Sequence, residues 1–151
     1  MARRVWIDGD SVAREARRLV ERHAGARGYD VVIVSDRRIR PASEERVETV
    51  VLEPKEEAVD RYLLEHVAPE ELVITRDIPL AESLLQRGAL VLNDRGEEFT
   101  EENIGKRRSE RDMMLLLRES GAVAPGGAKY GKKELKNFAD AFDRFVTKRL
   151  H

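Results

Sequence analysis

Short apolar runs alternate with amphipathic segments through the first ninety residues, and this alternation limits the possible folds more than any other feature. The runs are rich in β-branched residues, as in strands that are buried on both faces of a sheet. The segments between them repeat apolar residues at helical spacing, which favours helices that cross between parallel strands. We predict strands at residues 3–8, 31–35, 47–52, 72–75 and 89–92.

Helix boundaries are marked by glycine and proline. Gly25 and Gly28 follow the first helix, Pro69 follows the second, and Pro79 lies in the first turn of the third. The predicted helices cover approximately residues 11–23, 55–67, 79–88 and 100–121. A last helix follows a Pro-Gly-Gly break at 125–127, with Leu135, Phe138, Phe142 and Phe145 as its apolar stripe.

This order of elements predicts an α/β fold of three layers, with a mainly parallel five-stranded sheet between helices. Right-handed crossovers place the loops that follow the strands on one rim, and the common strand order 3-2-1-4-5 makes the first and fourth strands neighbours. The length of 151 residues predicts a single domain. Its core is expected at about residues 3–93, with a helical extension at about 100–150.

Several kinds of chemistry lack the residues they need. The chain has no cysteine, so it can form neither disulfides nor thiolate metal sites. Its histidines, His23, His66 and His151, are too dispersed for a catalytic triad or a zinc motif, and no glycine-rich nucleotide loop follows a strand. The N-terminal apolar run is too short for a signal peptide or a membrane span, so we expect a cytoplasmic protein without membrane partners.

Carboxylates follow two of the predicted strands. Asp8 and Asp10 end the first strand, and Asp77 follows the fourth. Because these strands are predicted neighbours, their acids can reach one hard cation such as Mg²⁺ or Mn²⁺. Asp60 lies early on the second predicted helix and can project over the same rim, as can Glu57 one turn earlier.

Each acid also has a purely structural alternative. Asp8 or Asp10 can cap the first helix, and Asp77 can cap the helix that Pro79 opens, since an aspartate there accepts backbone N–H bonds. Asp60 alone is typical of a solvated helix residue. The joint placement of two strand-end acids on one rim is what favours a metal site.

Basic residues near the same rim suit a nucleic-acid backbone. The net charge of −1 hides an acidic middle: residues 51–100 have 12 Asp and Glu against 5 Lys and Arg, between two basic segments. Guanidinium groups match phosphate oxygens bidentately, and few aromatic residues are available for base stacking. The candidate backbone-binding residues are Arg37, Arg38, Arg76, Arg108 and Arg111.

Five stretches carry a resemblance to a known family. They are VWIDGDSVA at 5–13, LVITRDIPLA at 72–81, LNDRGEEFT at 92–100, RRSERDMMLLLRESG at 107–121 and KKELKNFADAFDRF at 132–145. With these motifs the chain resembles the bacterial YaiI/YqxD family of PIN-like proteins over essentially its whole length. The resemblance implies a PIN-like sheet and a magnesium or manganese nuclease centre, with Asp8, Asp60 and Asp77 in the positions of the PIN acids.

The opening motif departs from the family pattern. That pattern reads Asp-Ala-Asp-Ala-Cys-Pro, whereas this chain has Gly9, Ser11, Val12 and Ala13 around the same two acids. Asp10 matches the second acid of the family motif, and any role of the Cys-Pro pair is lost. Asp94 stands where relatives often have proline, so no function is transferred to it.

Three functional hypotheses follow. The first is a PIN-like, Mg²⁺- or Mn²⁺-dependent nuclease acting on RNA or single-stranded nucleic acid, with Asp8, Asp10, Asp60 and Asp77 as metal-binding and catalytic residues. The second is a catalytically inactive PIN-like module that binds RNA or protein. The third is a haloacid-dehalogenase-type phosphatase with Asp8 as nucleophile, although the arginine before Asp77 and the Ile-Pro-Leu after it fit that chemistry poorly. Whether the chain forms a homo-oligomer is left open.

Overall fold

The sheet is built from strands in the predicted places. The computed structural model describes residues 3–124 and 129–149, so the Pro-Gly-Gly break at 125–127 and His151 lie outside the described residues. The strands are β1 (Arg4–Asp8), β2 (Asp30–Ser35), β3 (Val47–Val51), β4 (Leu72–Ile74), β5 (Leu90–Leu92) and β6 (Glu98–Phe99). The helices are α1 (Arg14–Arg27), α2 (Ala58–His66), α3 (Ile78–Gln86), α4 (Ile104–Glu119) and α5 (Lys132–Arg149).

The strand order is β3-β2-β1-β4-β5-β6. Its first five strands are parallel and follow the predicted order 3-2-1-4-5, which confirms the predicted α/β architecture with a mainly parallel sheet. The sixth strand, β6, was not predicted and pairs with β5 in the antiparallel direction. It is only two residues long, too short to show an alternating pattern, and it follows a turn in which Gly96 has a φ of 88°.

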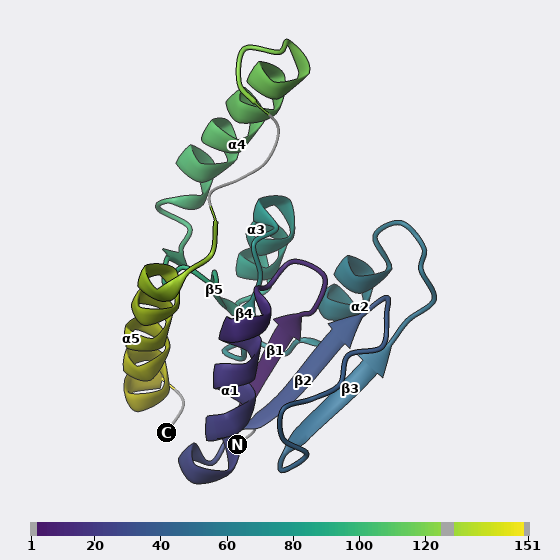
Figure 1. Ribbon diagram of the computed structural model, residues 1–151, viewed down its shortest axis with the longest axis vertical. Coiled ribbons are helices and arrows are strands. Elements are labelled where there is room, and N and C mark those ends of the chain that lie inside the picture. Colours follow the sequence, from purple (N-terminus) through teal and green to yellow (C-terminus); the bar gives the residue numbers. More distant parts are fainter. Residues whose placement is uncertain (1–2, 125–128, 150–151) are drawn as a thin grey trace.

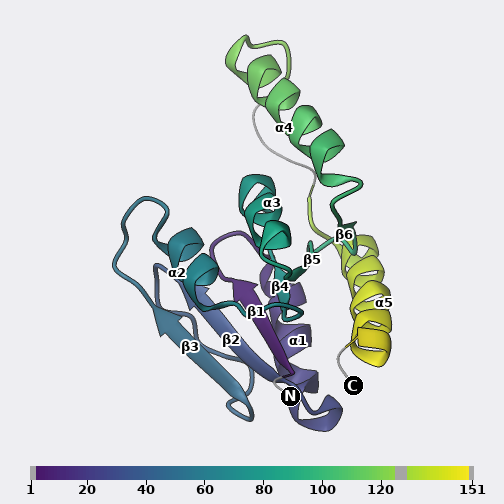
Figure 2. The same cartoon turned by 180° about the vertical axis from the view of Figure 1, so that it is seen from behind.

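Helices cover both faces of the sheet, giving three layers (Figures 1 and 2). On one face α1 and α5 pack against strand residues such as Val5 and Ile7. On the other face α2 and α3 pack against residues that include Trp6 and Val73. Successive side chains along β1 therefore enter opposite cores, as the pleat of a strand requires.

Trp6 is the only tryptophan of the chain and is 4% exposed. Its indole Nε1–H donates to Glu71 Oε1 at 3.0 Å, and the Arg4 guanidinium lies 5.6 Å from the ring centroid. The indole thus satisfies its polar group while its rings fill the core beneath α2 and α3.

Three helices begin later than predicted, and one of them, α4, begins at Ile104 rather than residue 100. α1 begins at Arg14 rather than residue 11 and continues through Gly25, because Gly28 forms the left-handed C-cap with a φ of 75°. α2 begins at Ala58 rather than residue 55, after Glu57, which has a φ of 61°. Residues 52–57 therefore form a loop, which lies beside the rim of the sheet that carries Asp8 and Asp77.

The helix α4 projects away from the sheet (Figures 1 and 2). Ile104 is its one buried residue among those described, and Met113 and Leu116 are 58% and 62% exposed. Among the described residues no helix is both long and apolar enough to cross a membrane.

Candidate functional site

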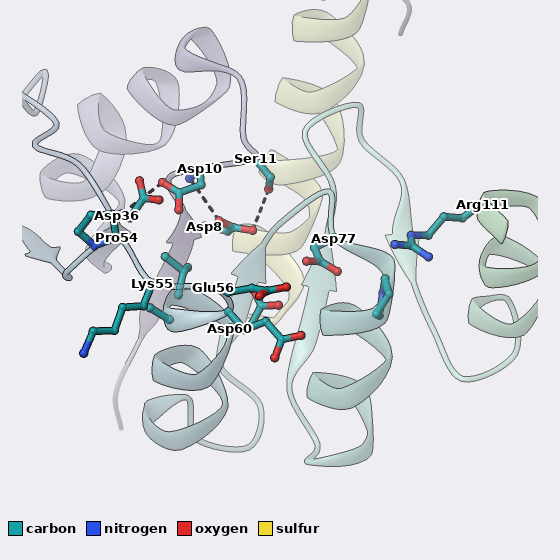
Figure 3. A pocket seen from close by; sticks show the side chains of 14 residues that line it. Asp8, Asp10, Ser11, Asp36, Pro54, Lys55, Glu56, Asp60, Asp77 and Arg111 are labelled. Atoms are coloured by element: carbon teal, nitrogen blue, oxygen red, sulfur yellow. Dashed lines mark hydrogen bonds between the residues drawn. The ribbon is translucent and has the colours of Figure 1, made fainter. Parts of the chain in front are cut away.

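A pocket of about 600 Å³ lies where β1 and β4 end, beside the start of α2. We call it the acid pocket, because seven carboxylates line it. They are Asp8, Asp10, Asp36, Glu56, Glu57, Asp60 and Asp77. All four predicted acids are among them: Figure 3 shows Asp8 and Asp10 at the end of β1, Asp60 on α2 and Asp77 before α3. The two basic residues that line the pocket are Lys55 and Arg111.

Asp8 is fixed by the register of the sheet. Ile7 of β1 is paired with Ile74 of β4, so Asp8 lies beside Thr75. The Thr75 hydroxyl donates to Asp8 Oδ2 at 2.7 Å and the Ser11 hydroxyl donates to the same oxygen at 2.9 Å. The side chain is only 4% exposed, and this burial raises the pKa of Asp8 despite the hydrogen bonds.

Asp10 faces the end of β2 rather than β4. Its Oδ1 accepts a hydrogen bond from the Ser35 hydroxyl at 2.9 Å and another from the Asp36 backbone N–H at 3.3 Å. The Arg37 Nε lies 3.8 Å from the same oxygen. Asp10 thus ties the loop after β1 to the loop after β2.

Among the neighbouring carboxylates, Asp77 has the largest electrostatic effect on Asp60. Burial, together with the negative charges of Asp77, Asp8 and Glu57, raises the pKa of Asp60 to about 6. A hydrogen bond with Asp77 contributes to the same rise in the pKa of Asp60. Figure 3 shows both side chains directed toward the same space below Asp8.

The structural alternatives divide between the acids. Asp77 does cap α3, because its Oδ1 accepts from Leu80 N at 3.0 Å. Asp8 and Asp10 do not cap α1, whose N-cap residue, Ala13, makes no side-chain capping bond. Instead the Ala13 N–H donates to Asp94 Oδ2 at 2.7 Å, from the loop after β5.

Only some of the predicted arginines lie near the acids. Arg111 lines the acid pocket, and Arg37 approaches Asp10. Arg76 instead pairs with buried Asp94 at 2.8 Å, and Arg108 pairs with Glu82 of α3 at 2.8 Å. Both guanidinium groups are thus paired with carboxylates that do not line the acid pocket.

Arg38 is exposed and lines a separate hollow on the far side of Gly9. That hollow contains further arginines that sequence reasoning did not assign.

The donors of the acid pocket fit a hard divalent cation in chemistry, since carboxylate oxygens are its usual ligands. After burial, the repulsion from Asp77, Asp8 and Glu57 is the next cause of the raised pKa of Asp60, and a bound cation would relieve that repulsion. In the described part of the chain, however, no three acidic or histidine side chains stand close enough together to hold one ion. Binding therefore requires rotation of side chains such as Asp60 toward the ion.

Sequence reasoning missed several residues of the site. Ser11 and Thr75 hold Asp8, Ser35 holds Asp10, and Asp36 lines the pocket. The sequence could have indicated these hydroxyl residues, because each lies within three residues of a strand-end acid or at the end of a predicted strand. The pairing of one hydroxyl with one carboxylate depends on sheet register, which sequence alone does not fix.

Comparison with known proteins places the chain in a family. The model described as "Uncharacterized BCR, YaiI/YqxD family" matches residues 6–148. The chain belongs to the YaiI/YqxD family. Its relatives include a UPF0178 protein of Ectopseudomonas mendocina, 41% identical over 145 residues, with 96% of this chain and 97% of the relative covered. A UPF0178 protein of Syntrophobacter fumaroxidans is 40% identical over 147 residues, covering 97% and 96%.

Proposed function

We propose that this YaiI/YqxD protein is a Mg²⁺- or Mn²⁺-dependent nuclease that hydrolyses phosphodiester bonds in RNA or single-stranded nucleic acid. The observation that supports it is the mutual placement of Asp8, Asp60 and Asp77. Three carboxylates from β1, α2 and the start of α3 face one pocket, where burial and the charges of Asp77 and Asp8 together raise the pKa of Asp60 to about 6. A fold stabilised only by packing gains nothing from such repulsion.

In this proposal Asp8 and Asp77 hold the cation, and Asp10 and Asp60 bind it directly or through water. A divalent cation held there supplies a bound water of lowered pKa and neutralises charge that develops on the phosphate. Thr75 positions two of the acids, because its hydroxyl donates to Asp8 and accepts from the Asp77 backbone N–H at 3.0 Å.

Cationic side chains at the mouth of the pocket then orient the substrate. Arg111 and Lys55 line the pocket, and each can donate to a phosphate oxygen. Arg37 lies next to Asp10 and can bind a neighbouring phosphate of the nucleic-acid strand. No aromatic residue lines the acid pocket in the described chain, so binding to the sugar-phosphate backbone is expected rather than recognition of bases.

The test is a Mn²⁺-dependent cleavage assay on mixed RNA and single-stranded DNA, with the variants Asp8→Asn and Asp77→Asn. Both variants should lose at least about 100-fold in rate, because each removes one charged ligand. The asparagine at 77 still caps α3, and the asparagine at 8 still accepts hydrogen bonds, so both variants should fold.

Asp140→Asn serves as the matched control, because Asp140 lies on α5 and pairs with Lys136 outside the acid pocket. It should keep full activity. Cleavage at the wild-type rate by both site variants would overturn the proposal.

One observation favours the inactive binding module as a second candidate. Asp8 is buried and bonded to two hydroxyls, and Asp77 caps a helix, so both acids have structural tasks without any metal. Titration with Mn²⁺ separates the two candidates: the nuclease binds the ion through these acids, and RNA binding by the module should survive their replacement.

The phosphatase hypothesis has less support from the site. Lys55 is the one lysine that lines the described pocket, and it follows the edge strand β3 rather than a late strand. A covalent phosphate trapped on Asp8 is the result that this hypothesis predicts.

A further inference from the structure

A second hollow, of about 880 Å³, lies on the other side of the loop after β1. Six of its eleven lining residues are arginines and none is acidic; we call it the arginine hollow. The arginines are Arg14, Arg17, Arg18, Arg37, Arg38 and Arg40. They come from the first half of α1 and from the loop after β2, two segments that the parallel pairing of β1 and β2 brings together.

Four of these six guanidinium groups form no salt bridge with the described residues. Arg17 pairs with Glu21, and Arg37 pairs with Asp36 at 3.2 Å. For the other four, no carboxylate of residues 3–124 or 129–149 lies within 4.0 Å. Glu21 also attracts Arg18, but the arginines outnumber the carboxylates near them and repel one another, so an anion placed among them lowers the free energy of the whole group.

The hollow is held in shape by buried contacts. We call the loop after β2, residues 36–42, the arginine loop. Glu21 is 1% exposed, and its Oε1 accepts a hydrogen bond from the Ala42 backbone N–H at 2.6 Å, which anchors the end of this loop on α1. Ile39 packs into the core beside Gly9. At the start of the loop, the Asp36 backbone N–H donates to Asp10. A hollow fixed at both ends of its loop does not have to order itself when a ligand binds.

The two hollows meet at the loop after β1. Gly9 lines the arginine hollow, whereas its neighbours Asp8 and Asp10 line the acid pocket. The Arg37 Nε, in the arginine hollow, lies 3.8 Å from Asp10 Oδ1. The two hollows are thus adjacent, and a ligand long enough to contact the arginines could also reach the acid pocket.

We propose that the arginine hollow binds the phosphate backbone of a single polynucleotide strand, next to the bond presented to the acid pocket. The position of that bond rests on the proposed nuclease function, whereas binding in the arginine hollow needs no metal. The ligand is a polymer, because a lone phosphate monoester at the acid pocket would leave the unpaired arginines unused. Binding does not depend on base sequence, since no aromatic side chain lines this described hollow.

The test measures the binding of labelled 20-nucleotide RNA and DNA single strands in EDTA, by fluorescence anisotropy. The full chain is compared with the double variant Arg38→Gln/Arg40→Gln. Affinity should fall at least about tenfold, and the slope of log K against log salt should become shallower by about 1.4, at about 0.7 per lost contact. Arg22→Gln/Arg144→Gln removes the same charge outside the arginine hollow and should change affinity less than about twofold.

Three outcomes would overturn the inference: no binding of either strand, equal losses in the two double variants, or equally tight binding of a duplex of the same sequence. Manganese-dependent hydrolysis of bis(p-nitrophenyl) phosphate separates this inference from the proposed nuclease. If the protein hydrolyses this compound but the double variant Arg38→Gln/Arg40→Gln binds strands as tightly as the wild type, only the inference about the arginine hollow is wrong. If Asp8→Asn still binds strands and the wild type hydrolyses nothing, only the proposed nuclease activity is wrong.

Discussion

The acid pocket and the arginine hollow share the loop after β1, but the repulsion between like charges can be reduced in different ways in the two regions. In the acid pocket, burial and the repulsion between neighbouring carboxylates raise the pKa of Asp60 to about 6, so this group can hold a proton in mildly acid solution. The arginines next door have no such outlet, because a guanidinium stays charged throughout the physiological range. Protonation of Asp60 can therefore reduce the repulsion in the acid pocket, whereas the repulsion in the arginine hollow can be reduced only by a bound anion.

The largest expected effect comes from the buried pair beneath the arginine hollow. Arg17→Ala leaves the Glu21 carboxylate buried without its partner, and we expect a loss of about 3 kcal/mol in unfolding free energy. Urea denaturation measures this loss. Single-strand binding should weaken as well, because Glu21 also holds the end of the arginine loop, while Mn²⁺ binding at the acid pocket should not change.

The double variant Arg17→Met/Glu21→Leu is the control, since apolar residues of similar volume replace the pair without leaving a charge behind. It should recover most of the lost stability. A cost below about 1 kcal/mol for Arg17→Ala would show that the pair does not support the hollow.

Gly9→Ala tests the junction between the two regions. A Cβ at this position would lie 2.8 Å from the Ile39 Cδ1, 3.0 Å from the Ser35 Cβ and 3.0 Å from the Val34 carbonyl oxygen. The side chains can shift but the carbonyl cannot, so we expect a cost of about 1–3 kcal/mol. Thermal unfolding measures it, and both metal and strand binding should weaken together.

Gly105→Ala provides the contrast, because nothing lies within 4 Å of a Cβ added there, on the exposed α4. It should stabilise the chain by about 0.5–1 kcal/mol through helix propensity. Equal behaviour of the two alanine variants would mean that Gly9 is not confined.

Asp60→Asn sharpens the contrast through pH. The folded-state pKa of Asp60 is raised, so the stability linked to its proton is fully present below about pH 3.8 and is lost as the pH rises through about 6. The asparagine variant has no charge to repel Asp77. It should therefore exceed the wild type by about 1–2 kcal/mol at pH 8, since solvent screens part of the repulsion, and match it near pH 4.

Denaturation at a series of pH values reads this difference directly, with Asp140→Asn as an exposed control that should follow the wild type. A constant offset between Asp60→Asn and the wild type across pH 4–8 would contradict the assignment of the repulsion to Asp60.

The sequence predicted the sheet order and the place of the acid pocket for one physical reason. Strand periodicity is a local property and the right-handed crossover holds for nearly all such folds, so neither depends on specific tertiary contacts. Together they place Asp8 and Asp77 on one rim of the sheet. Asp60 came from the family resemblance together with its place early on a helix.

What the sequence did not predict depends on tertiary contacts. The bond from Ala13 to Asp94 joins residues 81 positions apart, and the same carboxylate removes Arg76 from the site. Arg38 and Arg108 look alike in sequence, but Arg108 finds Glu82 on α3 and Arg38 finds no acid within reach in the described chain. Which arginine remains free for a ligand is decided by the distances between segments, not by composition.

Trp6 gives these measurements an internal optical probe. It is the sole tryptophan, it is buried, and it lies on β1 two residues before Asp8. Unfolding exposes the indole to water and breaks its bond to Glu71, so its emission should shift to longer wavelength. None of the variants described above alters Trp6 or Glu71. The fluorescence of one native side chain can therefore follow the integrity of the strand that carries the acid pocket, without any label.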